Sequence, residues 1–158
     1  MTEKRVALVT GGSRGIGAAI VKQGIGVKLA TFDTTTPNSQ LGAIMYAPHF
    51  MREQPEAARR FVVAYLRGIR DYNEAFTSGA RRDEAIQTLT KHTTIKDPAV
   101  FEQMTLPGLN PNGHLNLESI MATQEFWQRL GLMSAVVPAE QFVDHSYVDY
   151  ALGVLGRQ

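Results

Sequence analysis

The sequence predicts an α/β fold: a small parallel or mixed sheet of about three strands with a helix-rich C-terminal portion. Three short apolar runs, at residues 6–10, 27–32 and 41–47, have the composition of strands that are buried in a sheet. A helix is expected between the first two, at residues 15–23, and the glycines within residues 24–26 end it. The first two strands are then expected to pair in parallel through a right-handed crossover.

Helical periodicity dominates the chain after Pro48. The longest helix is expected to begin with Pro55 and to end at Gly79, with apolar side chains recurring along one face and arginines and glutamates forming a solvated face. A second helix is expected at residues 82–92. Further short helices are expected where capping residues and glycines mark helix boundaries, namely Asp97 with Pro98, Asn116 with Gly131, Pro138, and Asp144 with Gly156.

Length, charge and cysteine content exclude several classes of protein. The 158 residues suit one domain, residues 1–158, long enough to bury about two-thirds of its unfolded surface. The net charge of +1 gives no reason to expect binding to nucleic acid or to an anionic membrane. The chain has no cysteine, and its four histidines lack the spacing of paired ligands, so neither disulfides nor a metal site is expected.

The chain also lacks the sequence signals of membrane insertion and export. No apolar run approaches the roughly 18–20 residues that span a membrane. The apolar stretch after Lys4 and Arg5 is shorter than the roughly 7–15 residues that a secretory signal needs. The chain as written is therefore expected to stay in the cytoplasm.

A glycine-rich turn, TGGSRGIG at residues 10–17, follows the first predicted strand and opens the first predicted helix. Such glycines let the backbone approach a pyrophosphate, whose charge the helix N-terminus then favours. Arg14 would meet a ribose 2′-phosphate, whereas Asp33 would bind a ribose 2′-hydroxyl, and these two interpretations conflict. The alternative is a turn that binds no ligand. The candidate NAD(P)-binding residues are Gly11, Ser13, Arg14, Gly15, Ile16, Gly17 and Asp33.

Residues 1–23 resemble the N-terminus of the short-chain dehydrogenase/reductase family, whose cofactor turn is TGGSRGIG. The resemblance implies a Rossmann-like βα segment with NAD(P) as a possible cofactor. It also implies a catalytic tyrosine that is followed four positions later by a lysine. No tyrosine of this chain has that lysine, since the residues found there are Phe50, Ile69, Phe76, Ala151 and Val154. We therefore expect no dehydrogenase activity, no catalytic residues and no enzyme.

Residues 24–158 resemble the C-terminal part of the substrate-binding proteins of ABC transporters. The resemblance is to the nitrate, sulfonate and taurine type, including their thiamine-precursor-binding relatives. The stretches that carry it are TPNSQLGAIMYAPHFMREQPEAARRFVVAYLRGIRDYNEAF, LTKHTTIKDPAVFEQM, GLNPNGHLNLESI and VDHSYVDYALGVLG, in the family's order. The chain is thus expected to join two unrelated segments near residues 23–26.

The second resemblance implies part of a periplasmic-binding-protein type II fold, in which a solute is held between two lobes that close about a hinge. Residues 37–40 and the run after them resemble the segment that crosses between the lobes, so Asn38, Ser39 and Tyr46 are candidate solute contacts. Alternatively they are turn formers and a packed aromatic. Only one wall of the cleft is expected in this chain, and a solute that is half enclosed should bind weakly. The parent family is periplasmic and works with an ABC permease.

Three functions are compatible with these features of the sequence. The first is the solute-binding component of an ABC transporter, or a truncated or chimeric remnant of one, for a small organic anion or a pyrimidine-like solute. The second is an NAD(P)-binding module of the dehydrogenase type that lacks the catalytic pair. The third is an engineered chimera with no native ligand. Apolar surface left at a sheet edge or on helix faces further predicts a homo-oligomer.

Overall fold

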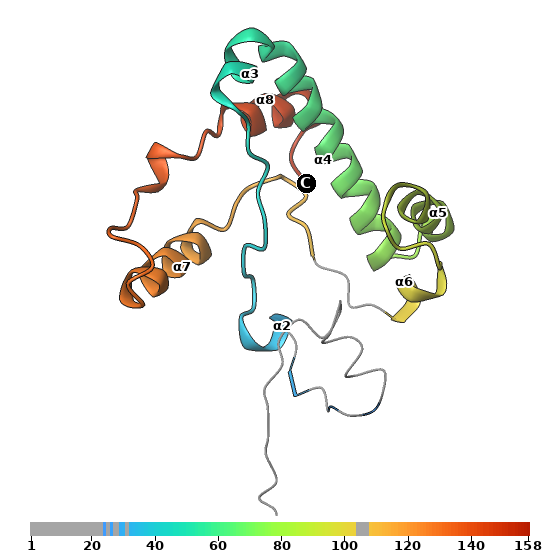
Figure 1. Ribbon diagram of the computed structural model, residues 1–158. Helices are drawn as coiled ribbons and strands as arrows, with labels where there is room; N and C mark the ends of the chain where they lie inside the picture. Colours follow the sequence, from blue (N-terminus) through green and yellow to red (C-terminus); the bar gives the residue numbers. More distant parts are fainter. Residues whose placement is uncertain (1–23, 25, 27–28, 31, 104–107) are drawn as a thin grey trace, which may run out of the picture. The chain divides into compact units, whose positions relative to one another are not determined.

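The computed structural model describes residues 24, 26, 29–30, 32–103 and 108–158, and the chain divides into two compact units, Met1–Ser39 and Gln40–Gln158. The elements of the described part are all helical (Figure 1). In the first unit α2 spans Phe32–Thr35. The second unit contains α3 (Pro48–Glu53), α4 (Pro55–Thr77), α5 (Arg82–His92), α6 (Ala99–Gln103), α7 (Leu117–Arg129), the 3-10 helix η1 (Ala139–Gln141) and α8 (Ser146–Leu155).

The predicted α/β fold with a sheet of three strands is wrong, because the described residues contain no strand. Of residues 27–32, Leu29 and Ala30 lie in neither helix nor strand and Phe32 begins α2. Residues 41–47 form no strand either and run as an extended segment into α3 (Figure 1). A strand needs the hydrogen bonds of a neighbouring strand, and no described segment supplies them. The strand predicted at residues 6–10 and the helix at 15–23 lie outside the described residues.

The helices predicted from Pro55 and at residues 82–92 are confirmed. α4 begins with Pro55 at its first position, and the chain turns at Gly79 with φ of +79°. α5 has the predicted bounds, Arg82–His92. Its first turn carries Asp83 and Glu84 and its last turn Lys91 and His92, a distribution that complements the helix dipole.

The capping residues of the later helices also act as predicted. The Asp97 Oδ1 atom accepts a hydrogen bond of 3.0 Å from the Ala99 amide. Asn116 Oδ1 accepts one of 3.1 Å from the Ser119 amide at the start of α7. Gly131 and Gly156 follow α7 and α8 with φ of +72° and +75°. The short helices expected after Pro138 and Asp144 are η1 and α8.

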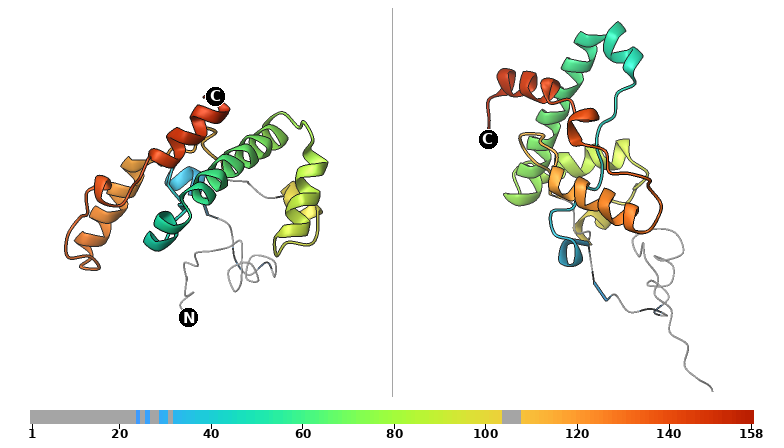
Figure 2. Two further views of the ribbon diagram at one scale, coloured as in Figure 1. Left: turned by 90° about the horizontal axis from the view of Figure 1, so that it is seen from above. Right: turned by 90° about the vertical axis from the view of Figure 1, so that its left-hand side faces the viewer.

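The core of the second unit lies where α8 packs against α4, an arrangement that the two views of Figure 2 also show. Val62 and Leu66 of α4 contact Ala151 and Leu152 of α8, and none of the four is more than 6% exposed. Burying each larger side chain contributes about 1.5–3 kcal/mol. None of the described helices is long and apolar enough to cross a bilayer.

Arg70 and Asn73 of α4 bind two segments that have no regular structure. The Arg70 guanidinium donates from Nε to the Pro111 carbonyl at 3.0 Å and from Nη2 to the Gly156 carbonyl at 2.6 Å. Asn73 Nδ2 donates to the Leu109 carbonyl at 2.7 Å. The loop before α7 and the C-terminal end of α8 are thereby attached to the same helix, and the carbonyls at the end of α8 gain a cationic partner.

Gly113 is the point where the loop before α7 approaches the core. Its φ is +73°, and a Cβ atom added there would lie 2.7 Å from Leu66 Cδ1. Leu66 is only 1% exposed and has little room to move. Both the backbone conformation and the close approach therefore require glycine here.

We expect Gly113→Ala to lower the free energy of unfolding by about 2–4 kcal/mol, because backbone strain and overpacking against Leu66 add together. The matched control is Gly131→Ala, at φ of +72° with no atom within 4 Å, which should lose only the strain of about 1–2 kcal/mol. Urea denaturation of both variants measures the difference. Equal losses would contradict the close contact with Leu66.

Candidate functional site

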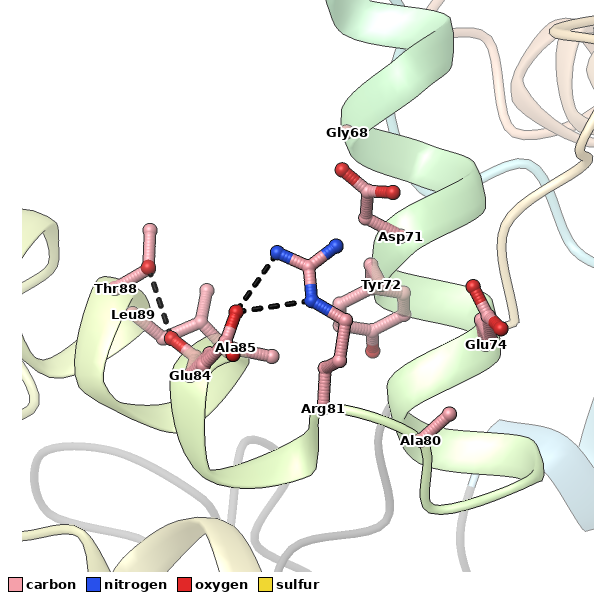
Figure 3. Close-up of a pocket in the computed structure, with 10 residues that line it drawn as sticks. All are labelled: Gly68, Asp71, Tyr72, Glu74, Ala80, Arg81, Glu84, Ala85, Thr88 and Leu89. Carbon is pink, nitrogen blue, oxygen red and sulfur yellow. Dashed lines mark hydrogen bonds and ion pairs between the residues drawn. The ribbon is translucent and has the colours of Figure 1, made fainter.

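A hollow of about 230 Å³ lies between the C-terminal half of α4 and the N-terminal part of α5 (Figure 3). α4 supplies one wall, the turn between the helices the floor, and α5 the other wall. The lining residues are Gly68, Asp71, Tyr72, Glu74, Ala80, Arg81, Glu84, Ala85, Thr88 and Leu89. Because α4 and α5 are consecutive and pack together, a short stretch of sequence forms the whole site.

The turn between α4 and α5 depends on two residues in the left-handed region. Gly79 has φ of +79° and Arg81 has φ of +54°. The left-handed conformation costs a residue other than glycine about 1–2 kcal/mol. The Arg81 side chain binds Glu84 one turn into α5, with Nε and Nη2 donating to the same carboxylate oxygen at 2.9 and 2.7 Å. This ion pair holds the guanidinium in the space between α4 and α5 (Figure 3).

The charge of the hollow is predominantly negative. Its lining residues include three acidic ones, Asp71, Glu74 and Glu84, against the single arginine Arg81, and the Glu74 carboxylate points away from α5 (Figure 3). The pKa of Arg81 is raised, first by its hydrogen bond to Glu84 and then by the charges of Glu84 and Asp71. The Arg81 and Glu84 side chains are 67% and 64% exposed, so solvent screens their ion pair, which orients the two groups more than it stabilises the fold.

Tyr72 gives the hollow an aromatic wall. Burial raises the pKa of its phenol, and its ring lies 5.0 Å from the ring of Phe76, centroid to centroid. Ala80, Ala85 and Leu89 add apolar surface. An aromatic face beside several carboxylates suits a small, flat, basic molecule, which can stack and donate hydrogen bonds at the same time. Within the described part of the chain, no three histidine, aspartate or glutamate side chains lie close enough together to hold a metal ion.

The predicted site residues lie elsewhere. Asn38 and Ser39 belong to the turn after α2, where Asn38 has φ of +61° and Ser39 Oγ donates to the Thr36 carbonyl at 2.7 Å. Asp33, predicted to end a strand, lies within α2 instead. The six candidates of the glycine turn, Gly11, Ser13, Arg14, Gly15, Ile16 and Gly17, lie outside the described residues.

Tyr46 packs against the start of α4 and does not line the hollow. Its hydroxyl donates a hydrogen bond of 2.8 Å to the Ala58 carbonyl. Its ring makes edge contacts with Phe50 and Tyr147, at centroid distances of 5.4 and 5.3 Å. The ring and the hydroxyl of Tyr46 thus both hold the extended segment before α3 against α4 and α8.

Sequence reasoning did not identify the hollow. Helical periodicity places Tyr72 on the apolar face of the long helix and Glu74 on its solvated face, and neither placement predicts a shared hollow. The available signal was the short connection from Gly79 to Arg82, which makes two consecutive helices fold back on each other. That signal does not indicate which side chains face each other, because it leaves the rotation of each helix open.

Comparisons with protein-family models, with curated proteins and with solved structures find no match to this chain. The resemblances to short-chain dehydrogenases and to ABC-transporter substrate-binding proteins therefore rest on the sequence stretches alone.

Tyr46→Phe should lower the free energy of unfolding by about 0.5–1.5 kcal/mol at neutral pH, since the Ala58 carbonyl loses its partner. The pKa of Tyr46 is raised, first by burial and then by the nearby Tyr147. Above the ordinary tyrosine value of 10.0 the unfolded chain therefore releases this proton more readily than the folded chain, and stability falls. We expect that alkaline loss to be smaller in Tyr46→Phe.

The matched control is Tyr150→Phe, because the Tyr150 hydroxyl has no hydrogen bond within the described residues and phenylalanine keeps the ring under Arg59. Urea titrations at a series of pH values follow stability, and tyrosinate absorbance follows ionisation. If Tyr150→Phe reduces the alkaline loss as much as Tyr46→Phe does, the assignment to Tyr46 is wrong.

Proposed function

We propose that the chain is a solute-binding component of an ABC transporter, or a truncated or chimeric remnant of one, and that its hollow takes a pyrimidine-like base. The resemblance of residues 24–158 supports the class of protein. The observation that carries the choice of solute is the lining of the hollow. Its residues include three acidic ones and Tyr72 but only one arginine, so their net charge is negative.

The charge distribution disfavours the alternative solute, a small organic anion. Asp71 and Glu74 form no ion pair with a described residue, and Glu84 already holds the guanidinium of Arg81. An incoming anion would meet a net negative charge, because the acidic lining residues outnumber Arg81, and it would have to displace Glu84 from Arg81. A basic ring meets the opposite situation, since each carboxylate attracts it.

An aminopyrimidine fits the chemistry of this lining. Its exocyclic amino group and its protonated ring nitrogen can donate two parallel hydrogen bonds to one carboxylate, as a guanidinium does. Its flat ring can stack on Tyr72, and a cationic ring gains further from the negative face of the phenol. Asp71, on the same helix as Tyr72 and on the side of that helix toward α5, is the acceptor that we assign to it (Figure 3).

The size of the hollow limits the solute and its affinity. At about 230 Å³ it is smaller than the roughly 300–1,000 Å³ that enclose larger organic ligands, so it suits a single ring. The hollow is lined only by α4, α5 and the turn between them, so a bound solute would keep part of its surface in water. We therefore expect a dissociation constant on the order of 1 mM, near −4 kcal/mol.

The test is a titration of the whole ¹⁵N-labelled chain with 4-aminopyrimidine, followed by amide chemical shifts, with taurine and nitrate as anionic comparisons. We expect shifts at the hollow with the aminopyrimidine and none with the anions. Asp71→Asn should weaken binding at least about fivefold, a change of about 1 kcal/mol. The matched control is Glu125→Gln on α7, which removes an exposed carboxylate far along the chain and should change nothing.

Three outcomes would contradict the proposal in different ways. Shifts with NADH at residues 11–17, without shifts at the hollow, would favour the nucleotide-binding alternative. No saturable shift with any of these compounds would leave the chimera without a native ligand as the better explanation. Equal weakening by Asp71→Asn and Glu125→Gln would show that binding depends on overall charge and not on the hollow.

A further inference from the structure

Residues 41–47 form an extended, exposed segment whose backbone hydrogen-bonding groups are largely unused. Leu41 is 69% exposed, Ile44 41% and Met45 90%. Within the described chain the backbone groups of these three residues and of Ala43 make no hydrogen bond. The Gly42 carbonyl accepts one from Gln40 Nε2 at 2.6 Å, and the Ala47 carbonyl accepts one from the Met51 amide at 3.2 Å. Apolar side chains beside unpaired backbone groups have the character of a sheet edge.

Both ends of this segment are fixed to the helical unit. At the first end the Gln40 amide donates to Ser119 Oγ at 2.9 Å, and the Asn116 amide donates to Gln40 Oε1 at 2.8 Å. At the other end the Tyr46 hydroxyl donates to the Ala58 carbonyl. The extended conformation is therefore already present before any partner binds, which lowers the entropy that pairing would cost.

The composition of the segment favours pairing as a strand. It reads LGAIMYA, without a charged residue, and Pro48 follows it. The devices that protect exposed edges, such as a lysine, a proline or a bulge inside the segment, are absent from its sequence. Ile44 and Tyr46 are residue types that favour strands.

We propose that residues 41–47 pair antiparallel with the same segment of a second copy of the chain, forming a two-stranded ribbon about a two-fold axis. The lack of charge argues for a second copy, because self-pairing then places no like charges opposite each other. Centred on Ile44, the pairing sets Leu41 opposite Ala47, Gly42 opposite Tyr46 and Ala43 opposite Met45. Every cross-strand pair is apolar, and the arrangement closes at two copies.

The interface is expected to be weak. A ribbon of two seven-residue segments is smaller than the roughly 1,200–2,000 Å² of a standard stable interface. We therefore expect a dissociation constant on the order of 100 μM. This association does not depend on the hollow between α4 and α5, whose lining shares no residue with the segment.

Sedimentation velocity of the full chain from about 10 μM to about 1 mM tests the proposal across the expected constant. We expect a reversible monomer–dimer equilibrium. We assign Ala43 and Met45 as hydrogen-bonded pairs of the ribbon, so Ala43→Pro removes an amide donor of the ladder and should weaken dimerisation at least about tenfold. Met45→Lys keeps the amide but adds charge, and should also weaken it. Circular dichroism checks that both variants keep the helical unit.

The matched control is Leu132→Lys, which changes another exposed apolar residue, 71% exposed, at the end of α7. It should leave the dimer intact, and amide hydrogen exchange of residues 41–45 should slow with concentration in the unaltered chain but not in Ala43→Pro. A chain that stays monomeric throughout overturns the proposal. So does a dimer that Leu132→Lys disrupts and Ala43→Pro does not, and so does growth beyond two copies.

Discussion

The packing of α8 against α4 around Leu66 is the interaction on which the rest of the helical unit depends. α4 is 23 residues long, and α3, α5 and α8 all pack against it. Leu66 is the largest fully buried side chain in the described part. Gly113 passes directly over it, and Arg70, one turn further along α4, holds the end of α8. Elements far apart in the sequence are therefore positioned by one helix.

The helical unit has a small core for its size. Its buried hydrophobic side chains are mostly in α4 and α8, while Phe126, Trp127, Leu130 and Leu132 at the end of α7 remain between 47% and 71% exposed. A domain of this length usually buries about two-thirds of its surface, and such exposed side chains commonly mark a surface that meets another body. α7 is held mainly by polar contacts, with Gln40 at its start and Gln124 bound to Val137. These hydrogen bonds attach α7 to the rest of the unit, while its apolar side chains stay largely exposed.

The hollow and the extended segment follow from different physical features of the same unit. The hollow forms because a tight turn brings the acidic and aromatic side chains of α4 opposite the first turns of α5. The segment stays exposed because its ends are fixed by Gln40 and Tyr46 while no described strand pairs with its middle. The first feature gathers acidic residues beside an aromatic ring, and the second leaves backbone groups of residues 41, 43, 44 and 45 without a hydrogen bond among the described residues.

The sequence by itself determined where the helices from Pro55 onward begin and end, but not the short helices α2 and α3. Pro55, Asn116, Gly131 and Gly156 act within one turn of their own positions, so their effect can be predicted without knowing the fold. It did not determine that residues 41–47 lack a partner strand, because strand pairing depends on distant segments. Tyr46 could equally have faced a solute or the core, and the lining of the hollow depended on how α4 and α5 are rotated. Only the tertiary structure decided these points, since each is a contact between parts of the chain that local patterns cannot orient.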